Sequence, residues 1–171
     1  FVVLGQLFFS SLAAYSFARI SFKGRNVVFF FYIATLMVPG QVTMIPTYLM
    51  FAKAGLTDNH LALILPAFFS SFGVFLLRQF FMSLPRELEE AAEIDGASGI
   101  QLVTRIVLPL ARPSILVTAV MILIYVWNEY LFATTFMTGA ENYTLAAGLY
   151  SLQATEMSGS WPVFAAASLV V

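Results

Sequence analysis

The residues best suited to charge-based chemistry are the acids of one short polar stretch, residues 86–96. This stretch carries five acidic side chains and one basic side chain, which gives it a net charge of −4. Acids that follow one another along a surface helix do not form the buried pair that general acid–base catalysis needs. They are suited instead to electrostatic contact with a basic partner surface. The five acids are Glu87, Glu89, Glu90, Glu93 and Asp95.

The sequence lacks the residues of the common catalytic and cofactor sites. It has no Cys and a single His, His60, which excludes thiolate chemistry and argues against a zinc site. No G-x-x-x-x-G-K-[ST] phosphate-binding loop occurs, so we expect no ATP hydrolysis by this chain. No basic patch indicates nucleic-acid binding. We therefore expect no catalytic residue, no metal and no cofactor bound by the chain itself.

The acidic stretch belongs to a longer segment, residues 83–109, that predicts two short helices joined by a turn. A Ser-Leu-Pro sequence is typical of a helix start, and acids that follow it complement the positive end of the helix dipole. Gly96 predicts the turn, because glycine adopts left-handed backbone conformations at little cost. Ser98 and Gln101 have capping-box spacing for the second helix. Two prolines, the first at Pro109, are expected to end that helix.

The remainder of the sequence is apolar enough to indicate a membrane protein. Hydrophobic residues make up 60% of the 171 residues and charged residues 10%, whereas soluble domains carry about 25% charged residues. A helix needs about 20 apolar residues to cross a bilayer. The sequence therefore predicts an all-α, polytopic transmembrane bundle. Four apolar segments fit that length and a fifth is cut short: residues 1–18, 27–52, 61–77, 114–137 and 161–171.

Basic residues predict the orientation of these segments. Seven of the eight Lys and Arg residues lie in the loops 19–26 and 78–113, and only Lys53 lies on the opposite side. Basic loops face the cytoplasm in most membrane proteins, so we place both loops there. The chain starts with Phe and both of its ends fall within apolar runs. We therefore expect one membrane domain over residues 1–171, with a first helix and a C-terminal end missing.

We interpret the cytoplasmic segment as a docking element for a partner protein. Small side chains at Ala91 and Ala92 would let its helix sit close in a groove of the partner. The alternative is an amphipathic helix that lies on the inner leaflet. Anionic lipid would repel a stretch with a net charge of −4, so docking is favoured.

The segment also resembles a known signature. Glu90-Ala91-Ala92, Gly96 and Ile106 have the spacing of the EAA motif, with three residues before the glycine and nine between it and the isoleucine. This motif marks permease subunits of binding-protein-dependent ABC importers. The wider sequence, including Val38-Pro39-Gly40-Gln41-Val42 and Trp127-Asn128-Glu129, is similar to the carbohydrate-uptake branch. Within that branch it most resembles the maltose-type second permease subunit.

The resemblance implies a set of partners. In the family, the permease subunit lies in the cell (inner) membrane as a multi-pass protein surrounded by lipid. It pairs with a second permease subunit, similar or identical, and with two cytoplasmic ATPase subunits that bind Mg–ATP. An extracytoplasmic solute-binding protein delivers the solute. The EAA helix is the coupling helix, which sits in a cleft of the ATPase. Carried over to this sequence, that contact comprises Glu90, Ala91, Ala92, Asp95 and Gly96.

The resemblance likewise implies a function. We expect the chain to form a solute pathway and to couple ATP hydrolysis by partner subunits to uptake of a carbohydrate. One alternative is uptake of another polar solute, such as a sugar phosphate. A second alternative is a membrane scaffold that moves no solute and uses the acidic segment only to recruit a cytoplasmic partner.

Polar residues inside the apolar segments are candidates for the substrate pathway. Glu129, which follows Asn128, is the only acid in any apolar run. Acids in membranes usually face the bundle interior or water, so Glu129 would either line the pathway or make a contact between helices. Pro39-Gly40 interrupts the second segment near mid-membrane, beside Gln41 and Thr43. Such an interruption is typical of transport pathways, although an ordinary proline kink is the alternative.

Overall fold

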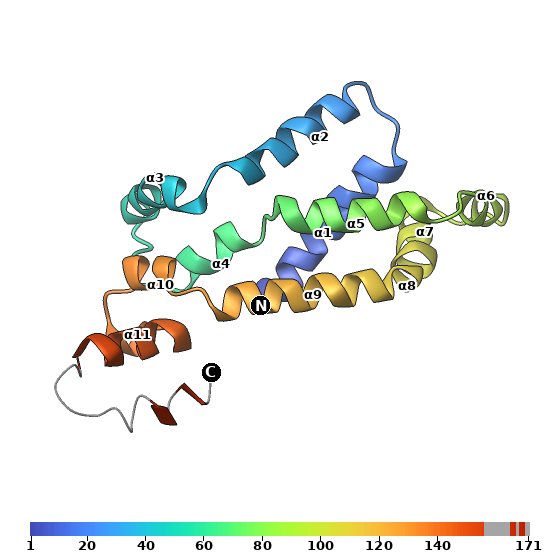
Figure 1. The fold of residues 1–171 in the computed structure, drawn as a ribbon. Helices are drawn as coiled ribbons and strands as arrows, with labels where there is room; N and C mark the ends of the chain where they lie inside the picture. The colour runs from blue at the N-terminus through green and yellow to red at the C-terminus, as the bar shows by residue number, and fades with distance from the viewer. Residues whose placement is uncertain (156–164, 167, 170–171) are drawn as a thin grey trace. The chain divides into compact units, whose positions relative to one another are not determined.

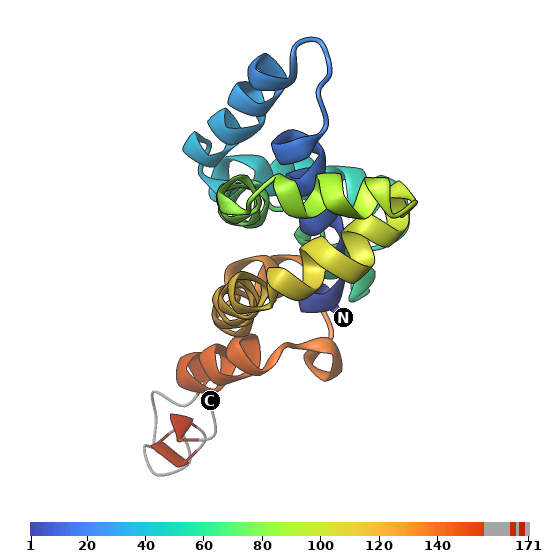
Figure 2. The same ribbon diagram turned by 90° about the vertical axis from the view of Figure 1, so that its right-hand side faces the viewer.

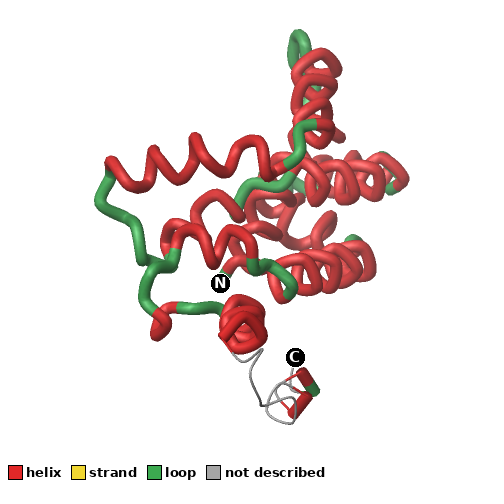
Figure 3. Tube along the Cα trace, turned by 60° about the vertical axis from the view of Figure 1, so that its left-hand side comes forward, coloured by secondary structure: helices red, strands yellow, loops and turns green. Residues whose placement is uncertain are grey.

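A computed structural model describes residues 1–155, 165–166 and 168–169. Within this part the chain forms helices and connecting loops and no β-strand (Figure 3). The all-α fold class is thereby confirmed. The predicted apolar segment 161–171 lies largely outside the described residues.

The helices follow the apolar segments of the sequence, but most segments are divided into two or more helices (Figure 1). The first half of the chain contains α1 (Val2–Arg19), α2 (Arg25–Ala34), the 3-10 turn η1 (Thr35–Met37), α3 (Gly40–Lys53), α4 (Leu61–Ala67) and α5 (Ser71–Ser83). The second half contains α6 (Glu87–Ile94), α7 (Gly99–Leu102), the π-helical turn η2 (Val103–Val107), α8 (Leu108–Leu110), α9 (Arg112–Trp127), α10 (Leu131–Phe136), the 3-10 turn η3 (Ala140–Asn142) and α11 (Leu145–Thr155).

Two compact units make up the fold, and each combines two stretches of the chain that are distant in sequence. The first unit contains residues 1–38 and 68–122, and the second contains residues 39–67 and 123–171. Each unit has its own cluster of buried hydrophobic side chains. The single membrane domain expected from the sequence stays a prediction.

In the first unit, α1 packs closely along α5 (Figures 1 and 2). The close approach depends on small residues at the contact. A Cβ atom added to Gly73 of α5 would lie only 2.9 Å from the hydroxyl oxygen of Ser10 in α1. A larger residue at position 73 would therefore push the two helices apart.

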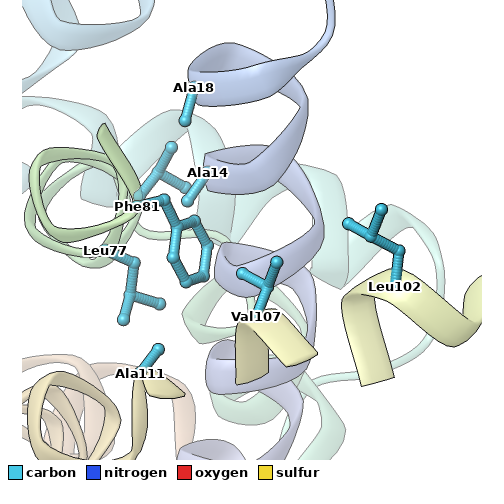
Figure 4. Packing of buried hydrophobic residues seen from close by; sticks show 8 residues of the cluster. Ala14, Ala18, Leu77, Phe81, Leu102, Val107 and Ala111 are labelled. Carbon is cyan, nitrogen blue, oxygen red and sulfur yellow. The ribbon is translucent and has the colours of Figure 1, made fainter. Parts of the chain in front are cut away.

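The core of the first unit forms between α1, the end of α5 and the segment that follows α7. Phe81 and Leu77 of α5 are fully buried, and the ring of Phe81 lies beside Ala14 of α1 (Figure 4). Val107 of η2 and Ala111 contribute to the same cluster. This core ties α1 to the segment 83–109, which carries the acidic residues.

The second unit is centred on a cluster of aromatic side chains. The ring of Phe136 in α10 lies 5.4 Å from that of Tyr48 and 6.1 Å from that of Phe51, measured between ring centroids. Both partners belong to α3, and both meet Phe136 edge-to-face, which is a favoured geometry for aromatic pairs. Phe132 stacks on Phe136 from within α10.

The second helix of the loop ends at Leu110, between Pro109 and Pro113, as predicted. The helical backbone passes Pro109 through the wider turn η2, in which the Leu108 N–H bonds to the Val103 carbonyl five residues earlier. A wider turn relieves the clash that a proline ring makes with the carbonyl of the preceding turn in an α-helix.

The prediction of one membrane helix over the apolar segment 114–137 is wrong. The helix α9 ends at Trp127, and a new helix, α10, starts at Leu131. At this break the Asn128 side chain donates its amide hydrogen to the Ile124 carbonyl, at 2.7 Å. Asparagine side chains that compete for backbone carbonyls in this way disfavour continuation of a helix.

The described residues include one helical segment that is long and apolar enough to cross a membrane, Leu61–Ser83, with 23 residues and a mean hydropathy of 1.9. Two bent helix pairs bring the number to three if each pair forms one span: Arg25–Met37 with Gly40–Lys53, and Gly99–Leu110 with Arg112–Trp127. The predicted number of spans therefore stays a prediction.

Candidate coupling loop and membrane-embedded polar residues

The acidic helix α6 follows directly after α5, at the end of that helix in the first unit (Figure 1). Its end has the hydrogen bonds of a Schellman motif. The Ala97 N–H bonds to the Ala92 carbonyl at 2.9 Å, and the Gly96 N–H bonds to the Glu93 carbonyl at 3.0 Å. Gly96 has a φ of +83°, the left-handed conformation that this motif requires. The predicted glycine turn is confirmed.

The second helix of the loop starts with the predicted capping box. The Gln101 N–H donates to the Ser98 hydroxyl at 3.4 Å, and the Ser98 N–H donates to the Gln101 side-chain carbonyl at 2.8 Å. Two backbone donors at the helix start are thereby satisfied. Both ends of the turn 95–98 are fixed by local bonds, so the loop has a defined shape without a partner.

A buried ion pair connects α6 to the end of α1. The Arg19 Nε lies 2.8 Å from the Glu89 Oε1, and these side chains are only 6% and 15% exposed. Burial raises the pKa of Glu89, and the nearby charges of Arg19 and Arg86 oppose that rise. Glu89 therefore faces its own chain and is the least available of the acids of α6 for contact with another protein.

The residues predicted to contact an ATPase differ in exposure. Glu90, Ala91, Asp95 and Gly96 are exposed, whereas Ala92 is largely buried against its own chain. A shallow depression adjoins the turn. Its lining residues are Asp95, Gly96, Ala97, Gln101, Arg105 and Ile106.

This loop, with EAA spacing on an exposed acidic helix, is characteristic of one protein family. Residues 6–171 match the family model described as the binding-protein-dependent transport system inner membrane component. The chain belongs to this family. Members are inner membrane components of transport systems, and the match covers nearly the whole sequence.

Curated relatives of this transport family include permeases for one named solute. The sn-glycerol-3-phosphate transport system permease protein UgpE of Shigella flexneri serotype 5b is 37% identical over 170 residues, which cover 99% of this chain and 60% of the relative. The protein of the same name from Yersinia pestis is 38% identical over 154 residues, or 90% of this chain and 55% of the relative. The chain thus spans no more than about 60% of the length of these relatives.

A solved structure has the same fold. It is a bacterial ABC transporter involved in the import of the acidic polysaccharide alginate. The TM-score is 0.80 at 27% sequence identity, over 99% of this chain and 59% of the solved chain. Taken with the family match, this likeness confirms the predicted resemblance to ABC importer permeases.

Two predicted pathway residues of this transport-system component lie at the start of α3. Pro39 occupies the N-cap position of α3 and Gly40 is its first residue, so the predicted interruption of the second segment is confirmed. Gln41 and Thr43 follow in the first turn and are exposed, and the Thr43 hydroxyl donates to the Gly40 carbonyl at 2.9 Å. The side-chain amide of Gln41 is therefore the more available of the two groups for a solute.

The other two predicted residues follow the end of α9. Asn128 is exposed and bonds within its own helix end. Glu129 is half-buried in the loop before α10, and its Oε1 accepts the Phe132 N–H at 2.7 Å. A carboxylate at a helix start satisfies a free backbone donor and complements the helix dipole. A role of Glu129 in the pathway and a contact of Glu129 with another helix both stay predictions.

Sequence reasoning missed Asp58, which joins two loops of the second unit. Its Oδ1 accepts the backbone N–H groups of Thr138 and Gly139 at 2.9 and 3.0 Å. These bonds lower the pKa of Asp58 below its ordinary value. Its φ of +58° places it in the left-handed region, which Asp tolerates better than most residues. An Asp three residues after a glycine in a short loop is a weak signal, and its partners are 80 and 81 residues away.

Proposed function

We propose that the chain is a permease subunit of an ABC importer, which forms part of a solute pathway and couples ATP hydrolysis by partner subunits to uptake. The observation that carries this proposal is the loop 83–109, in which an exposed acidic helix ends in a Schellman turn at Gly96. The family match and the likeness to an alginate importer support the same function.

The proposed partners follow from that function. Because the chain lacks a phosphate-binding loop, ATP and Mg²⁺ would be bound by two separate cytoplasmic ATPase subunits. We place their contact on Glu90, Ala91, Ala92, Asp95 and Gly96. Its exposed acids are suited to a basic partner surface. A second permease subunit, an extracytoplasmic binding protein and membrane lipid complete the set, with the chain as a multi-pass protein of the inner membrane.

The solute that we propose is a carbohydrate, and its pathway would include Gln41, Thr43, Asn128 and Glu129. These side chains offer the amide, hydroxyl and carboxylate groups that bind sugar hydroxyls. A specific observation favours a second candidate. Relatives with 37–38% identity are named for sn-glycerol-3-phosphate, which is a sugar phosphate in the broad sense.

Transport by the assembled importer tests the proposal. The full-length protein would be reconstituted in proteoliposomes with its second permease, its ATPase and its binding protein. We expect ATP-dependent uptake of a labelled carbohydrate, whereas preferential uptake of sn-glycerol 3-phosphate would select the second candidate. A complex that hydrolyses ATP but moves no solute of either class would contradict the proposal and indicate a scaffold.

A further inference from the structure

The buried pair of Arg19 and Glu89 lies where three helices of the first unit meet. Arg19 is the last residue of α1, and Glu89 lies in the first turns of α6. Arg19 also donates from Nη2 to the Leu84 carbonyl at 2.7 Å, just after the end of α5. One guanidinium group therefore contacts the ends of α1, α5 and α6.

A second arginine strengthens the same junction. Arg78 of α5 donates from Nε to the Phe17 carbonyl of α1 at 3.2 Å. Its guanidinium carbon lies 3.9 Å from the ring centroid of Phe29 in α2, which is a cation–π geometry. The C-terminal ends of α1 and α5 are thus held by directional contacts as well as by the apolar core.

Stability alone does not explain a charged pair at this position. Removing two charges from water costs several kcal/mol for each ion, and a buried ion pair often adds nothing over an apolar contact of the same volume. Burial also raises the pKa of Glu89, which indicates that its charge is costly here. The Arg19 Nε and the Glu89 Oε1 form an ion pair that lacks hydrogen-bond geometry. Such a pair still joins one particular side chain of α1 to one particular side chain of α6, which a general apolar contact does not do.

The connections along the chain explain what such a pair can do. Three residues, 84–86, join α5 to α6, so movement of α6 reaches α5 directly through the backbone. Arg19 and Glu89, by contrast, are 70 residues apart. Movement of α6 can therefore reach α1 only through contacts between side chains.

We propose that Arg19 and Glu89 form the link through which movement of the coupling helix α6 reaches α1, the helix of the first predicted membrane segment. The inference rests on the proposed function, because it assumes that α6 receives movement from an ATPase. Both residues are positioning residues, and neither is expected to touch the solute or the nucleotide. In this link Glu89 has a different task from Glu90, whose exposed side chain faces the partner.

The test is the number of solute molecules taken up per ATP hydrolysed, measured with complete importer complexes in proteoliposomes. We expect Glu89→Gln to lower this ratio about tenfold in complexes that still contain the ATPase and hydrolyse ATP. The neutral pair Arg19→Gln with Glu89→Gln is expected to give at least the same loss, because it breaks the same link and also removes the bond from Arg19 to the Leu84 carbonyl. The double variant leaves no unpaired buried charge, so the ratio can still be measured with this variant if Glu89→Gln alone fails to fold.

Glu87→Gln is the matched control, because it removes an exposed acid from the first turn of the same helix. It is expected to keep the wild-type ratio. The proposal would be overturned if Glu89→Gln kept the wild-type ratio, or if it only reduced the yield of complexes with a normal ratio. A wild-type complex that shows no uptake at all would instead refute the proposed function.

Discussion

At the scale of single residues, Gly96 is the position where conformation alone decides the outcome. A Cβ atom at this position would meet nothing within 4 Å, so only the φ of +83° resists a side chain. A left-handed conformation costs most residues about 1–2 kcal/mol, and asparagine tolerates it best after glycine. The two substitutions Gly96→Val and Gly96→Asn therefore separate backbone strain from loss of a small residue.

We expect Gly96→Val to distort the Schellman turn and to reduce solute uptake about tenfold without preventing membrane insertion. Gly96→Asn is expected to keep most of the uptake. Uptake and the amount of protein in the membrane would be measured for both. Wild-type uptake by the valine variant would show that the shape of this turn does not matter for coupling.

The hydrogen bonds of Asp58 predict that the stability of the folded protein depends on pH. Its pKa is lowered in the folded protein, chiefly by the backbone N–H groups of Gly139 and Thr138. A lowered pKa contributes stability that is present above the unfolded value of about 3.9 and is lost as the pH falls through the folded value. Asp58→Asn keeps a hydrogen-bond acceptor and tolerates the left-handed backbone, so it removes mainly the charge.

Thermal unfolding in detergent, followed between pH 7 and pH 3, measures this contribution. The wild-type protein is expected to be more stable than Asp58→Asn at pH 5–7. The difference should shrink as the pH falls below about 4, where the aspartate takes up its proton. If the difference in unfolding temperature between the two proteins stayed constant from pH 7 to pH 3, an ionised Asp58 between these loops would be refuted.

At the scale of secondary-structure elements, the sequence predicted the features that depend on neighbouring residues. The Gly96 turn and the capping box of Ser98 follow from local rules, and so does the interruption at Pro39. The break between α9 and α10 was not predicted, because the run 114–137 contains no Gly or Pro between Pro113 and Met137. The Arg19–Glu89 pair could not be predicted either, because nothing local indicates which of the five acids faces an arginine 70 residues away.

The start of α10 supports a prediction about Glu129. Its carboxylate accepts the Phe132 N–H, and loss of a capping group typically costs about 1 kcal/mol. Glu129→Gln keeps an oxygen acceptor but loses the charge, whereas Glu129→Ala loses both. We expect the alanine variant to be destabilised by about 1 kcal/mol and the glutamine variant by less, as measured by thermal unfolding.

Transport by the same two variants tests the pathway role of Glu129. If the carboxylate also contacts the solute, Glu129→Gln should reduce uptake several-fold while the ATPase still docks. Normal uptake by Glu129→Gln would assign the residue to helix capping alone.

At the scale of the whole molecule, the fold class and the family follow from both sequence and structure. The described residues are helical, and residues 6–171 match the family of transport-system inner membrane components. In the proposed importer the pathway is shared with a second permease subunit, so the choice of solute would depend on side chains of both subunits. Docking of the ATPase is different, because the proposed contact lies on one exposed segment of this chain.

The most direct measurement of the central claim is protection of position 91 by the ATPase. The 171 residues contain no Cys, so Ala91→Cys provides a single small label site among them; any Cys elsewhere in the full-length protein would first be replaced by Ser. Inverted membrane vesicles would be treated with a membrane-impermeant maleimide, with and without the ATPase subunits. Ser21→Cys, an exposed position in the other predicted cytoplasmic loop, is the control. We predict that the ATPase protects Cys at position 91 and leaves the control site reactive; equal labelling of position 91 with and without the ATPase would contradict the account.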